Sequence, residues 1–166
     1  MEKWDAYLKN GMKTELLLTR GQPIPDGLYH LVVDVLVQHN DGDLLFMQRA
    51  LDRRGYPGYF EASAGGSALS GEIAEQAALR ELEEETGIVP WDCRLVKIKR
   101  YDNDACFIHT FIARTDCDKE DIRLQEGETI AYKWVPLSDI DNFLNTHKVI
   151  PRQKDYITTL TTHGAR

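Results

Sequence analysis

Three glutamates, Glu81, Glu84 and Glu85, are the residues whose type and spacing best suit catalysis. On an ideal helix with about 100° per residue, they share an arc of about 100°, with Arg80 beside them and Glu83 on the back. Carboxylates this close repel one another unless a cation lies between them. Oxygen ligands of this kind suit Mg²⁺, with Mn²⁺ as an alternative. The cluster is compatible with a divalent-metal site, but for an acidic helix taken alone a solvated helix face is the commoner arrangement and stays the favoured alternative at this point.

A glycine pair lies shortly before these glutamates. Gly65 and Gly66 allow backbone conformations that are closed to other residues, so this loop could turn a carbonyl toward a metal or N–H groups toward a phosphate. Small side chains on the carboxylate side of the helix leave room for a loop or ligand; they are Ala74, Ala77 and Ala78.

The elements that must position these residues follow from hydrophobic patterning. The helix should run from residue 72 to 85, with Ser70 as its N-cap and Gly87 as its end. Strands are predicted at residues 29–37, 44–49, 59–64, 94–101, 105–113 and 129–135, with two short strands between 4 and 20 and later helices at 138–146 and 151–161. Because strands and helices do not alternate regularly, the pattern favours a mixed sheet covered by helices in one domain, residues 1–166.

The glutamate segment also carries a family resemblance. Every fixed position of the Nudix box, G-x₅-E-x₇-R-E-U-x-E-E-x-G-U with U apolar, is filled by Gly66, Glu72, Arg80-Glu81-Leu82, Glu84-Glu85 and Gly87-Ile88. The resemblance extends over residues 27–66 upstream and 132–137 downstream, and it departs at Ala64, where many members have a proline. It implies an α/β Nudix fold, an α/β/α sandwich around a mixed β-sheet, and a Mg²⁺-dependent hydrolase of small-molecule diphosphates.

The resemblance also implies a role for each matched residue. Glu84 and Glu85 would be the principal metal ligands, and Glu81 a further ligand or the base that orients water. The Gly65 carbonyl would complete the metal shell. Arg80 would hold the glutamates by ion pairing, which its adjacency to Glu84 favours.

Further site residues are expected around this set. Gly66 and Glu72 are auxiliary, although an ideal helix places Glu72 opposite the metal-binding glutamates. Members of the family often take one more carboxylate from another loop, for which Glu128 is the first choice and Glu126 the second, against a solvated turn.

Three arginines are candidate contacts for the diphosphate. Arg49 ends a predicted strand, and Arg53 and Arg54 lie in the following loop. The alternative is that such basic residues are simply solvated.

Two rival functions stay open. Residues 29–58 also resemble isopentenyl-diphosphate isomerase, a Nudix relative, but Gly65 and Ser67 stand where that enzyme needs its cysteine and metal-binding histidine. His30 matches another of its metal-binding histidines, and without the second one a structural role is favoured. The other rival is a nucleotide-binding Nudix module without turnover, which should have lost acidic ligands, and none is lost here.

Composition narrows the partners. The chain has 166 residues, 42% hydrophobic, and a net charge of −7, which argues against binding to duplex nucleic acid. It has neither a membrane-length apolar run nor an N-terminal signal pattern, so a cytoplasmic protein is expected. Three cysteines without a paired motif predict free thiols. A homodimer would fit the family, and a nucleoside diphosphate linked to another group is the favoured substrate among several.

Overall fold

The computed structural model describes residues 1–163, with the backbone alone for residues 159–163. Within this part, nine strands form one mixed sheet. The strands are β1 (Lys3–Leu8), β2 (Lys13–Thr19), β3 (Leu28–His39), β4 (Leu44–Arg49), β5 (Phe60–Ala62), β6 (Ala64–Ser67), β7 (Asp92–Tyr101), β8 (Cys106–Thr115) and β9 (Thr129–Val135). The helices are α1 (Ala74–Thr86), the 3₁₀ turn η1 (Leu137–Asp139), α2 (Ile140–Thr146) and α3 (Pro151–His163).

Strand β3 is the centre of this sheet. It pairs in parallel with β8 from His30 opposite Cys106 to His39 opposite Thr115, and antiparallel with β1, β4 and β6. Strand β4 continues the sheet through β5 and β9, and β7 extends it beyond β8. A run of β-branched residues suits such a strand, because both of its faces are covered.

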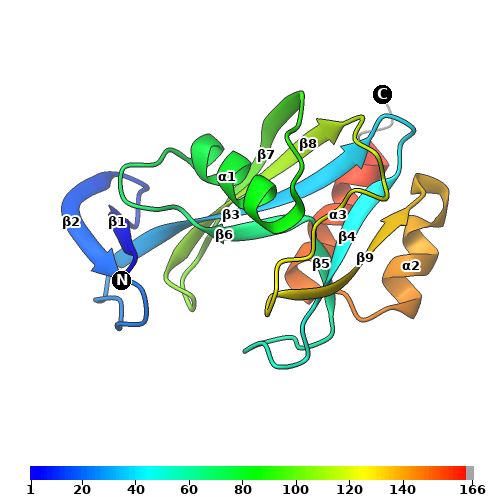
Figure 1. Ribbon diagram of the computed structural model, residues 1–166. Coiled ribbons are helices and arrows are strands. Elements are labelled where there is room, and N and C mark those ends of the chain that lie inside the picture. The colour runs from blue at the N-terminus through cyan, green and yellow to red at the C-terminus, as the bar shows by residue number, and fades with distance from the viewer. Residues whose placement is uncertain (164–166) are drawn as a thin grey trace.

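The two faces of β3 pack against different helices (Figure 1). Leu31, Val33, Val35 and Val37 share one core with the buried face of α1, whereas Leu36 joins a second core with α2 and α3. Successive side chains of a strand point to opposite faces, so one strand supplies both cores. The predicted α/β/α sandwich around a mixed sheet is therefore confirmed.

Several predicted boundaries were wrong. The segment 59–64 is not one strand but two, β5 and β6, separated by buried Ser63, whose hydroxyl donates to the Leu45 carbonyl and accepts from the Val37 N–H. Gly65 and Gly66 lie inside β6 rather than in a loop after it. Helix α2 is preceded by the 3₁₀ turn η1, so it begins at Ile140 rather than at Ser138.

The start of α1 was also mispredicted. The N-cap is Ile73, not Ser70, and the helix begins at Ala74, whereas the Ser70 hydroxyl is bonded to Asp5 on β1. The Ile73 N–H is satisfied instead by the Gln76 side chain. The end at Gly87 is confirmed, with φ of 76° and a hydrogen bond from its N–H to the Glu83 carbonyl.

Two expectations on segments away from the site can be compared with the fold. The front segment does form two short strands, β1 and β2, and all three cysteines are free. In the described part of the chain, no helix has the length and apolar character needed to cross a bilayer.

Candidate active site

The segment between β6 and α1 is tied down by a buried aspartate. Asp5 is 6% exposed and accepts hydrogen bonds from the Ser70 hydroxyl at 2.9 Å and the Gly71 N–H at 3.0 Å. It also pairs with Lys13 at 2.6 Å. Burial alone would raise the pKa of Asp5, but these partners lower it below its ordinary value. The N-terminal strands therefore fix the segment that leads into the glutamate helix.

Arg80 connects the glutamates with one another. Its Nε and Nη2 donate to both oxygens of Glu72 at 2.7 and 2.9 Å, and its Nη1 donates to Glu81 at 2.8 Å and Glu84 at 3.3 Å. A further bond reaches the Ser67 carbonyl at 3.3 Å. Hydrogen bonding to Arg80 lowers the pKa of Glu72. The ideal helix did not apply to Glu72, because this residue lies before α1 and folds back onto Arg80.

The glycines matter for close approach rather than for unusual backbone angles. Neither Gly65 nor Gly66 has a positive φ. A Cβ at Gly66 would lie 2.4 Å from Oε1 of Glu81, and a Cβ at Gly65 would lie 2.8 Å from the Val33 carbonyl. Gly65 also donates its N–H to Oε2 of Glu85 at 3.3 Å. Strand β6 therefore brings its backbone directly against the carboxylates of α1.

Glu85 is the carboxylate with the most perturbed ionisation. Burial, then the negative charges of Glu81 and Glu61, raises its pKa to about 9, and the hydrogen bond from the Gly65 N–H opposes this rise. Burial likewise raises the pKa of Glu81, although Arg80 opposes it. A cation beside Glu85 would remove this cost of ionisation. Among residues 1–158, whose side chains the structure describes, no three acidic, histidine or cysteine side chains already converge as a metal-binding group.

These residues line one cleft of about 490 Å³. Five glutamates and three arginines are among its described walls. The lining residues are Glu2, Trp4, Arg20, Arg53, Gly65, Gly66, Ser67, Leu69, Arg80, Glu81, Glu84, Glu85, Gln125 and Glu128. Glu83 is exposed and does not line the cleft, as expected for the back of the helix.

Sequence reasoning missed several residues of this cleft. Trp4 lies on β1, Glu2 directly precedes β1 and Arg20 directly follows β2, and Glu2 pairs with Arg20 at 2.8 Å. No local motif marks them, because only strand pairing brings the N-terminus to the site. Gln125 could have been predicted from the sequence, because it lies three residues before Glu128 in the same acidic turn.

The structure separates the candidates of the two loops. Glu128 lines the cleft and forms an ion pair with Arg53, whereas Glu126 is exposed and lies outside the lining. Of the three arginines expected to contact the diphosphate, Arg49, Arg53 and Arg54, only Arg53 lines the cleft. Arg49 donates to Glu61 at 2.8 and 3.0 Å, and Arg54 is exposed. The two loops thus meet across the cleft through Arg53 and Glu128.

His30 is packed inside the protein, against Trp4 and the Ala105 carbonyl. It is 9% exposed, its ring stacks on Trp4 with centroids 4.4 Å apart, and Nδ1 lies 3.1 Å from the Ala105 carbonyl. Burial lowers its pKa, which keeps the imidazole neutral.

Comparisons with known proteins agree with this geometry. Residues 28–159 match the NUDIX domain family. The chain is 34% identical over 152 residues to an uncharacterized Nudix hydrolase of Listeria innocua, covering 91% of this chain and 89% of the relative. It is 33% identical over 128 residues to isopentenyl-diphosphate Delta-isomerase 2 of Photorhabdus laumondii, covering 72% and 69%. A crystal structure of a Deinococcus radiodurans protein aligns with a TM-score of 0.73 and 17% identity, covering 99% of this chain and all of the other. The family match, the filled box and the cleft together show that this chain belongs to the Nudix hydrolase family.

Proposed function

We propose that this protein hydrolyses a diphosphate linkage in a small molecule, with Mg²⁺ as the cofactor and a nucleoside diphosphate joined to another group as the substrate. One observation carries the proposal: β6 presses its backbone onto a helix face whose glutamates line a single cleft together with three arginines. That arrangement provides negative ligands for a metal and positive contacts for a phosphate in the same space.

The metal would be held by Glu81, Glu84, Glu85 and the Gly65 carbonyl. The donor set fits Mg²⁺ or Mn²⁺ because it consists of hard oxygen ligands. The raised pKa of Glu85, caused by burial and by neighbouring carboxylates, supports a cation at this point. When bound, such an ion screens the diphosphate charge, polarises the phosphoryl group and lowers the pKa of a bound water.

Around this set, the protein residues have positioning and proton-transfer roles. Arg80 holds Glu81 and Glu84 in place and is itself held by Glu72. Arg53 would contact the diphosphate after exchanging its partner Glu128 for a phosphate oxygen. A glutamate of the cleft accepts the proton of the attacking water as the new oxygen–phosphorus bond forms and the bridging oxygen leaves with the other phosphate.

The dimensions of the cleft support a substrate larger than a bare diphosphate. Its volume of about 490 Å³ lies in the range of sites for small organic ligands. The walls continue past the glutamates to Trp4, Leu69 and Arg20. These residues supply apolar surface and a positive charge for the group attached to the diphosphate.

A substrate panel tests the proposal. Purified protein with Mg²⁺ is incubated with nucleotide sugars, dinucleotides, nucleoside triphosphates and prenyl diphosphates, and released phosphate-containing products are quantified. We expect metal-dependent cleavage of at least one compound. Chelation of the metal should abolish it.

Matched variants of one helix make the test specific. Glu84→Gln and Glu85→Gln should lose turnover, whereas Glu83→Gln removes an equal charge from the exposed back of α1 and should retain it. Turnover that survives both site substitutions contradicts the proposal. Isomerisation of a prenyl diphosphate without phosphate-bond cleavage, or nucleotide binding without any turnover, would establish one of the two rival functions.

A further inference from the structure

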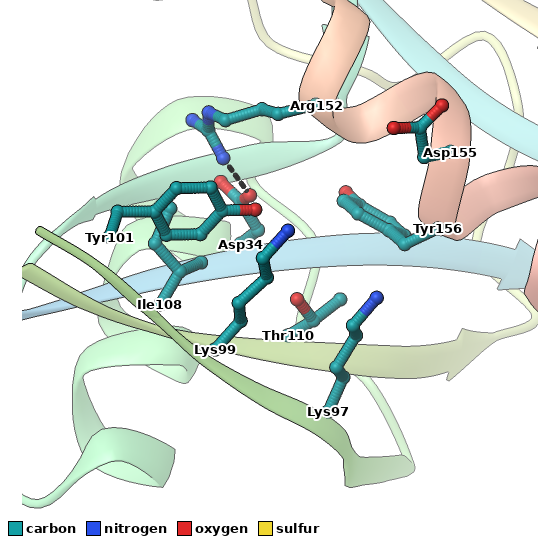
Figure 2. A pocket seen from close by; sticks show the side chains of 9 residues that line it. All are labelled: Asp34, Lys97, Lys99, Tyr101, Ile108, Thr110, Arg152, Asp155 and Tyr156. Carbon is teal, nitrogen blue, oxygen red and sulfur yellow. Dashed lines mark hydrogen bonds and ion pairs between the residues drawn. The ribbon is translucent and has the colours of Figure 1, made fainter. Parts of the chain in front are cut away.

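A second cavity lies on the face of the sheet opposite the glutamate helix. It has a volume of about 250 Å³ and lies between α3 and the strands β7 and β8. Figure 2 shows its nine lining side chains: Asp34, Lys97, Lys99, Tyr101, Ile108, Thr110, Arg152, Asp155 and Tyr156. None of these residues lines the catalytic cleft, so the two sites are separated by the sheet.

Two lysines, Lys97 and Lys99, bring positive charge to this cavity. Lys97 and Lys99 occupy alternate positions of β7, which places both on the same face of the strand. Figure 2 shows both ammonium groups directed into the cavity toward α3. Among the described residues, no hydrogen bond or ion pair ties either lysine, and Lys99 lies over the Tyr101 ring at 4.9 Å.

Asp34, the buried acidic residue of the cavity, is engaged by residues of α3 rather than by either lysine. Asp34 is 2% exposed and is already bound to Arg152 and to the Gln153 amide, which lies 3.4 Å away. Asp155 is the other acidic residue of the lining and lies on the exposed side of α3. The cavity thus contains three cationic side chains, of which one is engaged by the buried aspartate.

A buried hydroxyl adds a neutral donor. Tyr156 is 5% exposed, and its hydroxyl has no hydrogen-bond partner among the described atoms. Figure 2 shows this hydroxyl facing the cavity, on the side across from Lys97 and Lys99. Burial raises the pKa of Tyr156 well above its ordinary value, so the group stays protonated and remains a donor. Buried polar groups usually have partners, so a ligand atom is a natural one here.

We propose that this cavity is a binding site for a phosphate group, held by Lys97, Lys99 and the Tyr156 hydroxyl. A tetrahedral oxyanion accepts hydrogen bonds from several directions at once, which suits donors that come from a strand on one side and a helix on the other. The volume admits a phosphate with a small substituent against Ile108. Because the site lies across the sheet from the cleft, the proposal does not depend on the hydrolase reaction.

Titration of inorganic phosphate, followed by NMR of the ¹⁵N-labelled protein, tests the site. Chelator is present so that metal-dependent binding in the catalytic cleft does not contribute, and the ionic strength is held constant with chloride. We expect saturable shifts of amides in residues 97–101 and 152–156. Acetate at the same concentrations should produce smaller and non-saturating shifts.

Variants decide whether the named groups bind the anion. The Lys97→Gln/Lys99→Gln double variant should weaken the phosphate affinity by about tenfold, and Tyr156→Phe by about threefold, because charged donors contribute more than neutral ones. Lys154→Gln removes a lysine of α3 that does not line the cavity and should bind as the wild type does. Both lysines are exposed, so the double variant should fold, and its spectrum verifies this. Absence of saturable shifts, an unchanged affinity of the double variant, or equal binding of acetate would overturn the proposal.

Discussion

Replacement of Gly66 by alanine isolates the close contact between β6 and α1. A Cβ at this position would lie 2.4 Å from Oε1 of Glu81, 2.5 Å from its carboxyl carbon and 2.8 Å from Oε2. Ordinary van der Waals contact begins at 3.4 Å, so the carboxylate must withdraw by about 1 Å, the difference between 3.4 and 2.4 Å. A misplacement of about 1 Å in a catalytic group costs on the order of 10²-fold in rate, or about 2.7 kcal/mol.

The assay compares kcat/KM of Gly66→Ala and wild type with Mg²⁺ and the compound that the substrate panel identifies. We expect a loss near 10²-fold with a change in unfolding free energy below about 1 kcal/mol, because the atoms that move end a flexible side chain. Gly42→Ala is the matched control, since Gly42 has a φ of 99° in a turn away from the cleft. It should lose about 1 kcal/mol of stability through backbone strain and retain activity. An activity of Gly66→Ala within about twofold of wild type would refute the reasoning.

Three further predictions concern stability. Arg80→Gln leaves partly buried Glu72 without its arginine partner, so urea unfolding should show a loss of about 1–3 kcal/mol, and an unchanged midpoint would contradict this. Without metal, Glu85 has a pKa of about 9 in the folded protein, against the ordinary value of 4.5 expected in the unfolded chain. As the pH rises, the unfolded chain therefore loses this proton before the folded protein does. The free energy of unfolding should therefore fall as pH rises from about 4.5 to about 9, and Glu85→Gln should flatten that slope; parallel slopes would contradict the assignment. Gln153→Leu removes the acceptor of the Ala62 N–H at 2.7 Å and should lower stability by about 1–3 kcal/mol, whereas an unchanged denaturation midpoint would show that this bond is dispensable.

The sequence by itself determined the helix and the cluster of carboxylates on it. Glu81, Glu84 and Glu85 meet because residues three and four apart share a helix face, whatever the rest of the chain does. The end at Gly87 was equally local, since a left-handed position after a helix favours glycine. The sandwich fold could be anticipated because hydrophobic patterning and the Nudix box agree over most of the chain.

Only the tertiary structure decided how the cluster is built into a site. Glu72 reaches Arg80 because the segment before α1 folds back and is held by Asp5. Asp5 bonds Ser70 and Gly71, which lie 65 and 66 positions further along the chain. Glycine is needed at position 66 because the Glu81 side chain of α1 lies against this point of β6. The conformational freedom of a glycine pair does not reveal such a contact from the sequence. Strand pairing likewise brought the N-terminus to the cleft and kept Arg49 out of it by giving it Glu61. Helix spacing is a property of neighbouring residues, whereas these contacts join distant segments and depend on how the whole sheet pairs.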